Sequence, residues 1–222
     1  VLFRSRDNET ANYTASGTSM ATPQVTGAAA LVRSARPASS AREIKAILLA
    51  SAESIASQNP TLDRNAYGLG FLRDDLAVAL AQRPGAVFSG SLAVPAPPVL
   101  HPITVVSGQT YSVCLVFHRQ GLTTTSWSDL SLRVLDGTTE LASSDDPRNL
   151  YERVTFTAPH SGVLLVEVSA TMLEVAPLPY SLATTATFAI GTPANWSNIG
   201  GGCAGTKGIP SLFPQEIGRA HV

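Results

Sequence analysis

The strongest constraint on the fold is a change in the spacing of apolar residues near the middle of the chain. In the first part they recur at helical spacing, as Val25, Ala28, Ala29 and Val32 do. From residue 103 to about residue 190 they alternate with polar residues instead, which is typical of strands with one buried face. The two periods predict an α/β part that is followed by an all-β antiparallel sandwich.

Caps and turn residues divide the chain further. Helices are expected over residues 20–35 and 74–81, and another begins at Ser40, which forms a capping-box pattern with Glu43. Proline and small residues are frequent in residues 83–102, a composition that predicts a semi-rigid linker. The expected segments are residues 6–82 (α/β part), 83–102 (linker), 103–190 (sandwich) and 191–216 (a Gly-rich tail or the start of a further module).

The two ends of the chain are expected to be non-native. Residues 1–5 can be encoded by GTG CTC TTC CGA TCT, and the reverse complement of this DNA, read from its third base, encodes Ile-Gly-Arg-Ala. The same four residues occur as Ile217 to Ala220. One DNA word on opposite strands at both ends resembles sequencing-adapter read-through, so residues 1–5 and 217–222 are set aside.

Composition excludes two classes of function. Apolar residues make up 44% of the chain, but no apolar run is long enough to span a membrane. The 15 basic and 16 acidic residues leave a net charge of −1, which provides no general attraction to nucleic acid. Cys114 and Cys203 are too few for a disulfide framework, and pairing between them stays open. Low charge and scarce cysteine suit a secreted bacterial protein.

The most informative motif is Ser16-Gly17-Thr18-Ser19-Met20-Ala21-Thr22-Pro23, directly ahead of the first expected helix. A nucleophilic serine gains from this position, because a helix N-terminus offers unpaired N–H groups and a positive dipole end to a developing oxyanion. Pro23 is expected in the first helical turn, where its missing N–H is tolerated. Taken alone, however, a serine ahead of a helix is better explained as a plain N-cap.

Gly17-Thr18-Ser19-Met20-Ala21 followed by Pro23 resembles the serine box of the subtilisin-like serine proteases, the subtilases. The resemblance extends over about residues 12–82, through the helix after the serine and as far as the turn Tyr67-Gly68-Leu69-Gly70 and the helix that follows. It implies the last part of an α/β catalytic domain, with Ser19 as the nucleophile, polypeptides as substrates and secretion by a bacterium. Gln24 stands where histidine is frequent in the family.

A catalytic serine needs a general base and a carboxylate that orients the base. In subtilisin-type enzymes the order along the chain is Asp, His, Ser. Here His101, His118 and His160 all follow Ser19, and His221 lies in the suspect end. The Asp, the His and the oxyanion-hole Asn are therefore expected upstream of this chain, which should not hydrolyse peptides by itself. An α/β-hydrolase is excluded, because its Gly-x-Ser-x-Gly elbow would require glycine at Ala21.

The β region resembles, less specifically, the pre-peptidase C-terminal domains that follow many secreted bacterial proteases. The matching stretches are Ser143 to Asp146, Glu152 to Phe156, Thr157 to Gly162, and Tyr180 with Leu182. This resemblance implies an accessory role in secretion, stability or substrate attachment. No cofactor is expected. Asp145 and Asp146 have the oxygen ligands that calcium prefers, but a solvated turn explains the pair better.

The sequence thus predicts a C-terminal piece of a secreted subtilisin-like serine endopeptidase. The alternative is a non-catalytic adhesion or carbohydrate-binding protein in which the sandwich is the working part. A fragment that lacks most of its catalytic sheet should expose the apolar faces of its two long helices, whereas residues 103–190 should fold alone. Cys114, on an expected strand, is interpreted as a buried and inert thiol. Nothing in the sequence indicates an oligomeric state.

Overall fold

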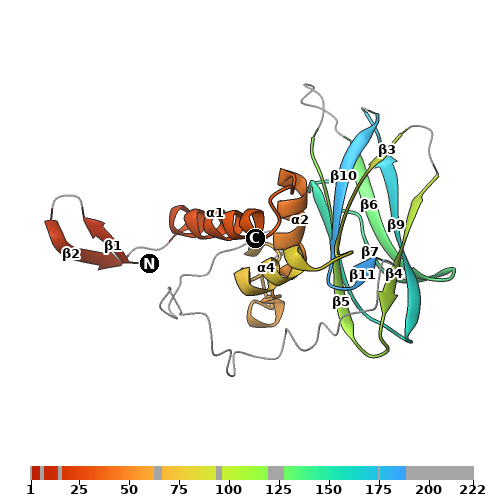
Figure 1. The fold of residues 1–222 in the computed structure, drawn as a ribbon, viewed down its shortest axis with the longest axis horizontal. Coiled ribbons are helices and arrows are strands. Elements are labelled where there is room, and N and C mark those ends of the chain that lie inside the picture. The colour runs from red at the N-terminus through yellow and green to blue at the C-terminus, as the bar shows by residue number, and fades with distance from the viewer. Residues whose placement is uncertain are drawn as a thin grey trace.

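The computed structural model describes residues 2–5, 8–14, 17–62, 67–93, 97–119, 128–174 and 176–188. The chain passes from a hairpin through helices into a sandwich of two sheets (Figure 1). The hairpin consists of β1 (Leu2–Ser5) and β2 (Asn8–Thr14), and the helices are α1 (Thr18–Ala35), α2 (Ala41–Ser51), the short 3₁₀ helix η1 (Ala56–Gln58) and α4 (Asp74–Gln82). The sandwich strands are β3 (Val87–Leu92), β4 (Val99–Val105), β5 (Thr110–Phe117), β6 (Asp129–Asp136), β7 (Thr139–Ser144), β8 (Tyr151–Thr157), β9 (Gly162–Met172), β10 (Leu178–Thr184) and β11 (Thr187–Phe188).

The predicted antiparallel sandwich is confirmed. One sheet has the strand order β3-β10-β5-β8 and the other β11-β4-β9-β6-β7, and the described pairings within both are antiparallel. The expected alternation in β5 is correct, because Tyr111, Val113, Leu115 and Phe117 all face the space between the sheets and are buried. Leucines and valines of β6 and β9 meet them from the other sheet and complete the core.

The expectation of a linker over residues 83–102 is wrong for half of that segment. It contains β3 and the start of β4, so the sandwich begins at Val87 rather than at residue 103. Proline fits in β4 because it occupies a position with a partner strand on one side only. Pro102 pairs with Leu165 of β9, whereas β11, on the other side of β4, pairs only with Ile103 and Thr104.

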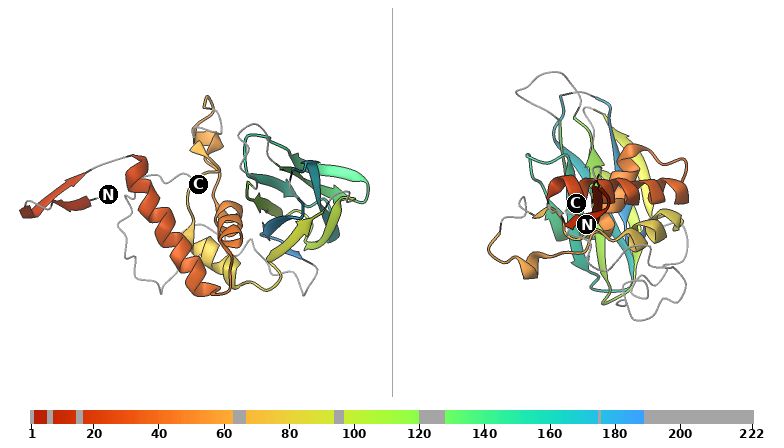
Figure 2. Two further views of the ribbon diagram at one scale, coloured as in Figure 1. Left: turned by 90° about the horizontal axis from the view of Figure 1, so that it is seen from above. Right: turned by 90° about the vertical axis from the view of Figure 1, so that its left-hand side faces the viewer.

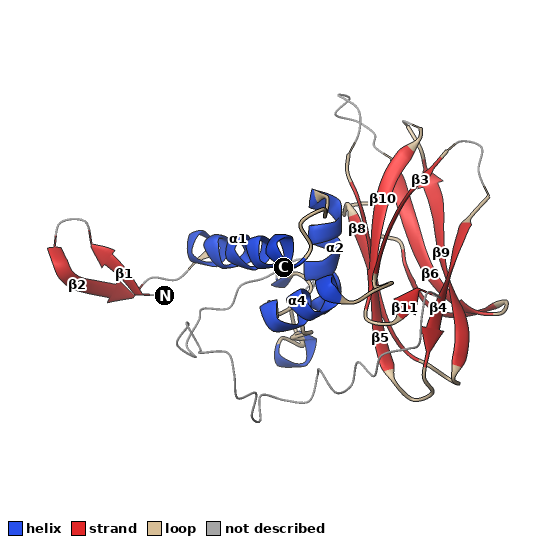
Figure 3. Ribbon diagram, in the orientation of Figure 1, coloured by secondary structure: helices blue, strands red, loops and turns tan. Residues whose placement is uncertain are grey.

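The helices form a layer over the outer face of the four-stranded sheet (Figure 3). The capping box predicted for α2 is present, with the Glu43 N–H donating to Ser40 Oγ and the Ser40 N–H donating to the Glu43 carboxylate. The apolar face of α2 packs against β5 and β10, so the expectation that this face is exposed is wrong. Ile47 and Leu48 are buried as predicted, and Ile44 is half-buried.

Helix α1 is covered along only part of its length. It packs on α2 and α4 through its C-terminal half, where Ala28 and Val32 are buried. The N-terminal half has no buried residue among those described, and even in the C-terminal half Leu31 is 48% exposed. The hairpin β1–β2 extends beyond this N-terminal end, away from the sandwich (Figure 2). No helix in the described part of the chain is long and apolar enough to cross a membrane.

The turn after the helical segment depends on Gly70. Its φ is +131°, and a Cβ built there would lie 1.9 Å from the Glu53 carbonyl oxygen. Glu53 and Phe71 form a two-way bridge in which the Glu53 N–H donates to the Phe71 carbonyl and the Phe71 N–H donates back. This bridge ties the segment after α2 to the segment before α4. Only glycine allows so close an approach of the two backbones.

Substitution Gly70→Ala should therefore open this bridge and destabilise the fold by roughly 1–3 kcal/mol or more. Gly162→Ala is the matched control, because φ there is also positive (+143°) but the nearest contact of its Cβ is an ordinary 3.6 Å. Thermal unfolding of the two variants should show the larger loss for Gly70→Ala. Equal losses would mean that the bridge does not matter.

Glu152 is a buried carboxylate within the sandwich, with 1% of its surface exposed. It accepts hydrogen bonds from the Ser144 hydroxyl and from the Asp146 N–H, which closes the loop between β7 and β8. Burial raises the pKa of Glu152 to about 7, despite these hydrogen bonds. The folded protein thus holds a proton on Glu152 at pH values where the unfolded chain has released it.

Because the pKa of Glu152 is raised from 4.5 to about 7 on folding, the free energy of unfolding should fall as pH rises through this window. The loss from this group amounts to at most about 3 kcal/mol above the window. Glu152→Gln cannot ionise, so it should not lose stability in this way. The melting temperature of the variant minus that of the unsubstituted protein should therefore increase between pH 5 and pH 8. Parallel melting curves across this range would contradict the raised pKa.

Candidate active site

Ser19 lies in the first turn of α1, not at its cap. The N-cap is Gly17, whose φ of +134° turns the chain into the helix and which provides no side-chain cap. The interpretation of Ser19 as a plain N-cap is therefore wrong. The Ser19 side chain is exposed at the end of α1 that faces away from the sandwich (Figure 2).

The backbone around Ser19 presents hydrogen-bond donors to the outside. The N–H groups of Met20 and Ala21 are both directed to the Gly17 carbonyl, at 3.0 and 3.2 Å. The N–H groups of Thr18 and Ser19 come before them, and helix geometry gives these no acceptor inside the helix. Together with the positive end of the helix dipole, they form an environment that stabilises negative charge.

Pro23 is the sixth residue of α1, so its expected place in the first turn is wrong. A proline inside a helix removes the hydrogen bond to the carbonyl four residues earlier, which here is the Ser19 carbonyl. Neighbouring polar side chains bond to other carbonyls of this exposed half. Thr22 Oγ1 donates to the Thr18 carbonyl at 2.8 Å, and Gln24 donates to the Met20 carbonyl at 3.2 Å. The backbone at Ser19 is thus held less tightly than a regular helix would hold it.

No histidine in the described part of the chain reaches Ser19. His101 is buried in the sandwich, where its Nε2 lies 2.9 Å from the Tyr180 hydroxyl, and burial lowers its pKa. His118 is exposed just after β5, and partial burial and the charges of Arg42 and Lys45 lower its pKa.

His160 does have a carboxylate partner, but the pair lies in the sandwich and not near Ser19. Its Nε2 lies 3.0 Å from Asp136 Oδ2, and this hydrogen bond raises the pKa of His160. Asp136 ends β6 and His160 precedes β9, so the pair joins two turns of the sandwich. The other ring nitrogen of His160 faces the Ser161 carbonyl, which leaves no serine hydroxyl positioned for activation.

In the acidic loop before β8, the Asp146 carboxylate is hydrogen-bonded to other residues of the same loop. Asp146 accepts hydrogen bonds from the N–H and the guanidinium of Arg148 and from the Asn149 amide. Asp129 is buried nearby, and burial together with the charges of Asp145 and Asp146 raises its pKa. Among the described residues, no three His, Cys, Asp or Glu side chains are arranged to hold a metal ion. A calcium ion bound by Asp145 and Asp146 stays untested.

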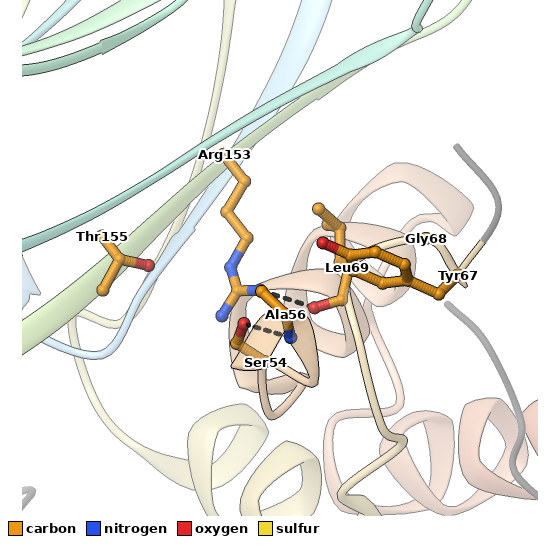
Figure 4. A pocket seen from close by; sticks show the side chains of 7 residues that line it. All are labelled: Ser54, Ala56, Tyr67, Gly68, Leu69, Arg153 and Thr155. Atoms are coloured by element: carbon orange, nitrogen blue, oxygen red, sulfur yellow. Dashed lines mark hydrogen bonds between the residues drawn. The ribbon is translucent and has the colours of Figure 1, made fainter. Parts of the chain in front are cut away.

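A hollow of about 260 Å³ lies at the junction between the helical layer and the sandwich (Figure 4). It is lined by Ser54, Ala56, Tyr67, Gly68, Leu69, Arg153 and Thr155. Figure 4 shows the Arg153 side chain extending from its strand toward the Leu69 carbonyl, to which it donates. Ser19 is not part of this hollow. Sequence reasoning did not identify Arg153, because a single arginine on a strand carries no recognisable pattern.

Comparison with known proteins agrees with the serine motif. The family model described as "Subtilase family" matches residues 3–70, which includes Ser19 and all of α1 and α2. No curated protein sequence matches the chain.

Two solved structures share features with the sandwich. One is the pre-peptidase C-terminal domain of collagenase from Bacillus anthracis, at 12% identity and a TM-score of 0.36, over 46% of this chain and 89% of that one. The other is Aeromonas hydrophila PliG, a periplasmic inhibitor of g-type lysozyme, at 19% identity and a TM-score of 0.33, over 45% of this chain and 82% of that one. Neither resemblance is close enough to carry a functional argument. The family resemblance therefore comes from the match around the serine: residues 3–70 match the model of the subtilase family.

Proposed function

We propose that this chain is the C-terminal part of a secreted serine endopeptidase that hydrolyses peptide bonds through Ser19. The intact parent protein would contain an α/β catalytic domain, of which residues 6–82 are the last part, followed by an accessory sandwich like a pre-peptidase C-terminal domain. The order Asp, His, Ser places the catalytic histidine and aspartate ahead of Ser19 in the parent, so the hydrolytic activity of this chain alone should be negligible.

The observation that carries this proposal is the position of Ser19 within a segment of the subtilase family. Its hydroxyl is exposed, and its N–H belongs to the first turn of a helix that Gly17 leaves without a side-chain cap. A scissile carbonyl that approaches Ser19 would meet both the nucleophile and a backbone donor for the oxyanion. Exposure of the N-terminal half of α1 supports the same proposal, because this surface would be covered by the rest of the catalytic domain.

In the parent, an upstream histidine would accept the Ser19 proton as the hydroxyl attacks the carbonyl carbon. The Ser19 N–H and a second donor from upstream would stabilise the oxygen as it becomes negative. The same histidine would then protonate the leaving amine, and water would release the acyl group from Ser19. Within this chain, α1 supplies the attacking hydroxyl, one oxyanion donor and a favourable dipole.

Substitution Ser19→Ala in the full-length parent should abolish peptide hydrolysis, by roughly 10⁶-fold in kcat, the scale known for loss of the catalytic serine in subtilisin itself. The melting temperature should change little, because the side chain is exposed. Ser34→Ala is the control, since Ser34 is an exposed serine near the other end of the same helix. It should keep full activity.

Retained hydrolysis in a folded Ser19→Ala variant would reject the proposal. If the parent shows no hydrolysis at all, but binds a polymer equally well with and without Ser19, the alternative of an adhesion or carbohydrate-binding protein would be favoured. Casein cleavage and binding to insoluble polysaccharide, measured on the same preparations, separate these outcomes.

A further inference from the structure

The outer face of the four-stranded sheet carries small and apolar side chains that are buried. Along β5 the residues that point away from the sandwich core are Ser112, Cys114 and Val116, and all three are buried, with Cys114 and Val116 at 0% exposure. Ala183 of β10 is buried on the same side. A sheet face made of small and apolar side chains would be unfavourable in water. The sandwich therefore has two buried faces, one of them outside its own core.

Helix α2 supplies the cover. Its residues from Ala46 to Ala50 are buried, and the helix contacts both β5 and β10. Cys114, Val116 and Ala183 belong to the same continuous apolar cluster as α2, and Val32 of α1 and Leu80 of α4 extend it on the far side of α2. The serine-bearing helix is thus linked to the sandwich through α2.

Arg153 of β8 adds a polar connection across this junction. Its guanidinium donates to the Ala52 carbonyl at 2.8 Å and to the Leu69 carbonyl at 3.1 Å, and its Nε is fixed by Ser112 Oγ at 2.9 Å. Ala52 is the C-cap of α2, where helix carbonyls lack backbone donors and a cation is favoured by the dipole. A strand of the sandwich thus supplies the donor at the C-terminal end of a helix in the catalytic segment.

Two further side chains cross the same boundary. Lys45 of α2 places its ammonium 5.4 Å from the ring centre of Tyr151, the first residue of β8. Arg83, directly after α4, donates to the Thr185 carbonyl and to Thr187 Oγ1 next to and within β11. Arg83 and Arg153 bond to oxygens that the sequence places far away, so neither contact can form until the sandwich has folded.

We propose that the β-sandwich is an obligatory docking partner of the serine-bearing helices, with Arg153 as the residue that locks α2 and the Gly68–Gly70 turn onto it. The helices and the sandwich then unfold as one unit, and the position of α1 depends on the sandwich being intact. This inference goes beyond the proposed protease function and does not require Ser19 to be a nucleophile.

The importance of Arg153 follows from the burial of the two residues whose carbonyls it binds. Ala52 and Leu69 are 3% and 4% exposed, so their carbonyls have little access to water if Arg153 is removed. A buried acceptor that loses its donor is costly, and more so when the donor is charged. Arg133 offers a matched comparison, because it is an arginine on a strand that bonds to Glu167, but on the outer face of the other sheet.

Hydrogen exchange followed by mass spectrometry on the full chain tests the lock. Arg153→Ala should uncouple the two parts, so that the exchange of α2 amides rises by about tenfold or more while β4 and β9 stay protected. Arg133→Ala should change the exchange of α2 by no more than it changes that of β4 and β9. Arg153→Lys keeps the charge but not the three-way geometry, so it should fall between the two and remain folded. Equal α2 exchange in Arg153→Ala and Arg133→Ala would overturn the assignment of Arg153.

A second variant tests the coupling from the other side. Leu164 is fully buried between the two sheets, on β9, and β9 is not among the strands that α2 contacts. Leu164→Ala should weaken protection in β9 and in α2 by the same factor, because both open in one transition. If α2 keeps its protection while β9 loses it, the helices fold independently of the sandwich and the proposal is wrong.

Discussion

Burial of β5 on both faces determines how the two parts of this protein are joined. One face of the strand contributes Val113, Leu115 and Phe117 to the core between the sheets, and the other contributes Cys114 and Val116 to a second core beneath α2. Every side chain from Tyr111 to Phe117 is buried as a result. The strand is therefore shared by two apolar clusters, and neither cluster is complete without it.

The same arrangement explains why the two ends of α1 differ. Its C-terminal half joins the second core through Ala28 and Val32, whereas Ser19 is exposed and no residue from 17 to 27 is fully buried. A serine nucleophile has to be accessible to substrate, but its backbone has to be held in place. In this chain α1 is fixed at its C-terminal half, which packs on α2, and α2 in turn packs on the sandwich. The proposed upstream part of a catalytic domain would pack against the N-terminal half.

The sequence predicted local features well where the signal lay in neighbouring residues. The capping box of Ser40 and Glu43 and the residues of β5 that face the sandwich core needed no tertiary information, and both were confirmed. The proline-rich segment was misinterpreted, because a proline at a position paired on one side, such as Pro102, has the same local composition as a linker. The apolar Cys114 and Val116 at positions that should face solvent were the available sign of a covered sheet. No sequence pattern indicated the role of Arg153, because this role depends on carbonyl groups that are far away in the sequence.

For the site, the motif located Ser19, and the family match includes it. Sequence could not place its surroundings, because in the proposed function the partners of Ser19 come from residues upstream of this chain. The most direct test of Ser19 as the nucleophile is to label the full-length parent with a fluorophosphonate and to locate the adduct by tandem mass spectrometry. A single adduct on Ser19 is predicted, lost on denaturation before labelling. An adduct on another serine, with Ser19 unmodified, would contradict the account.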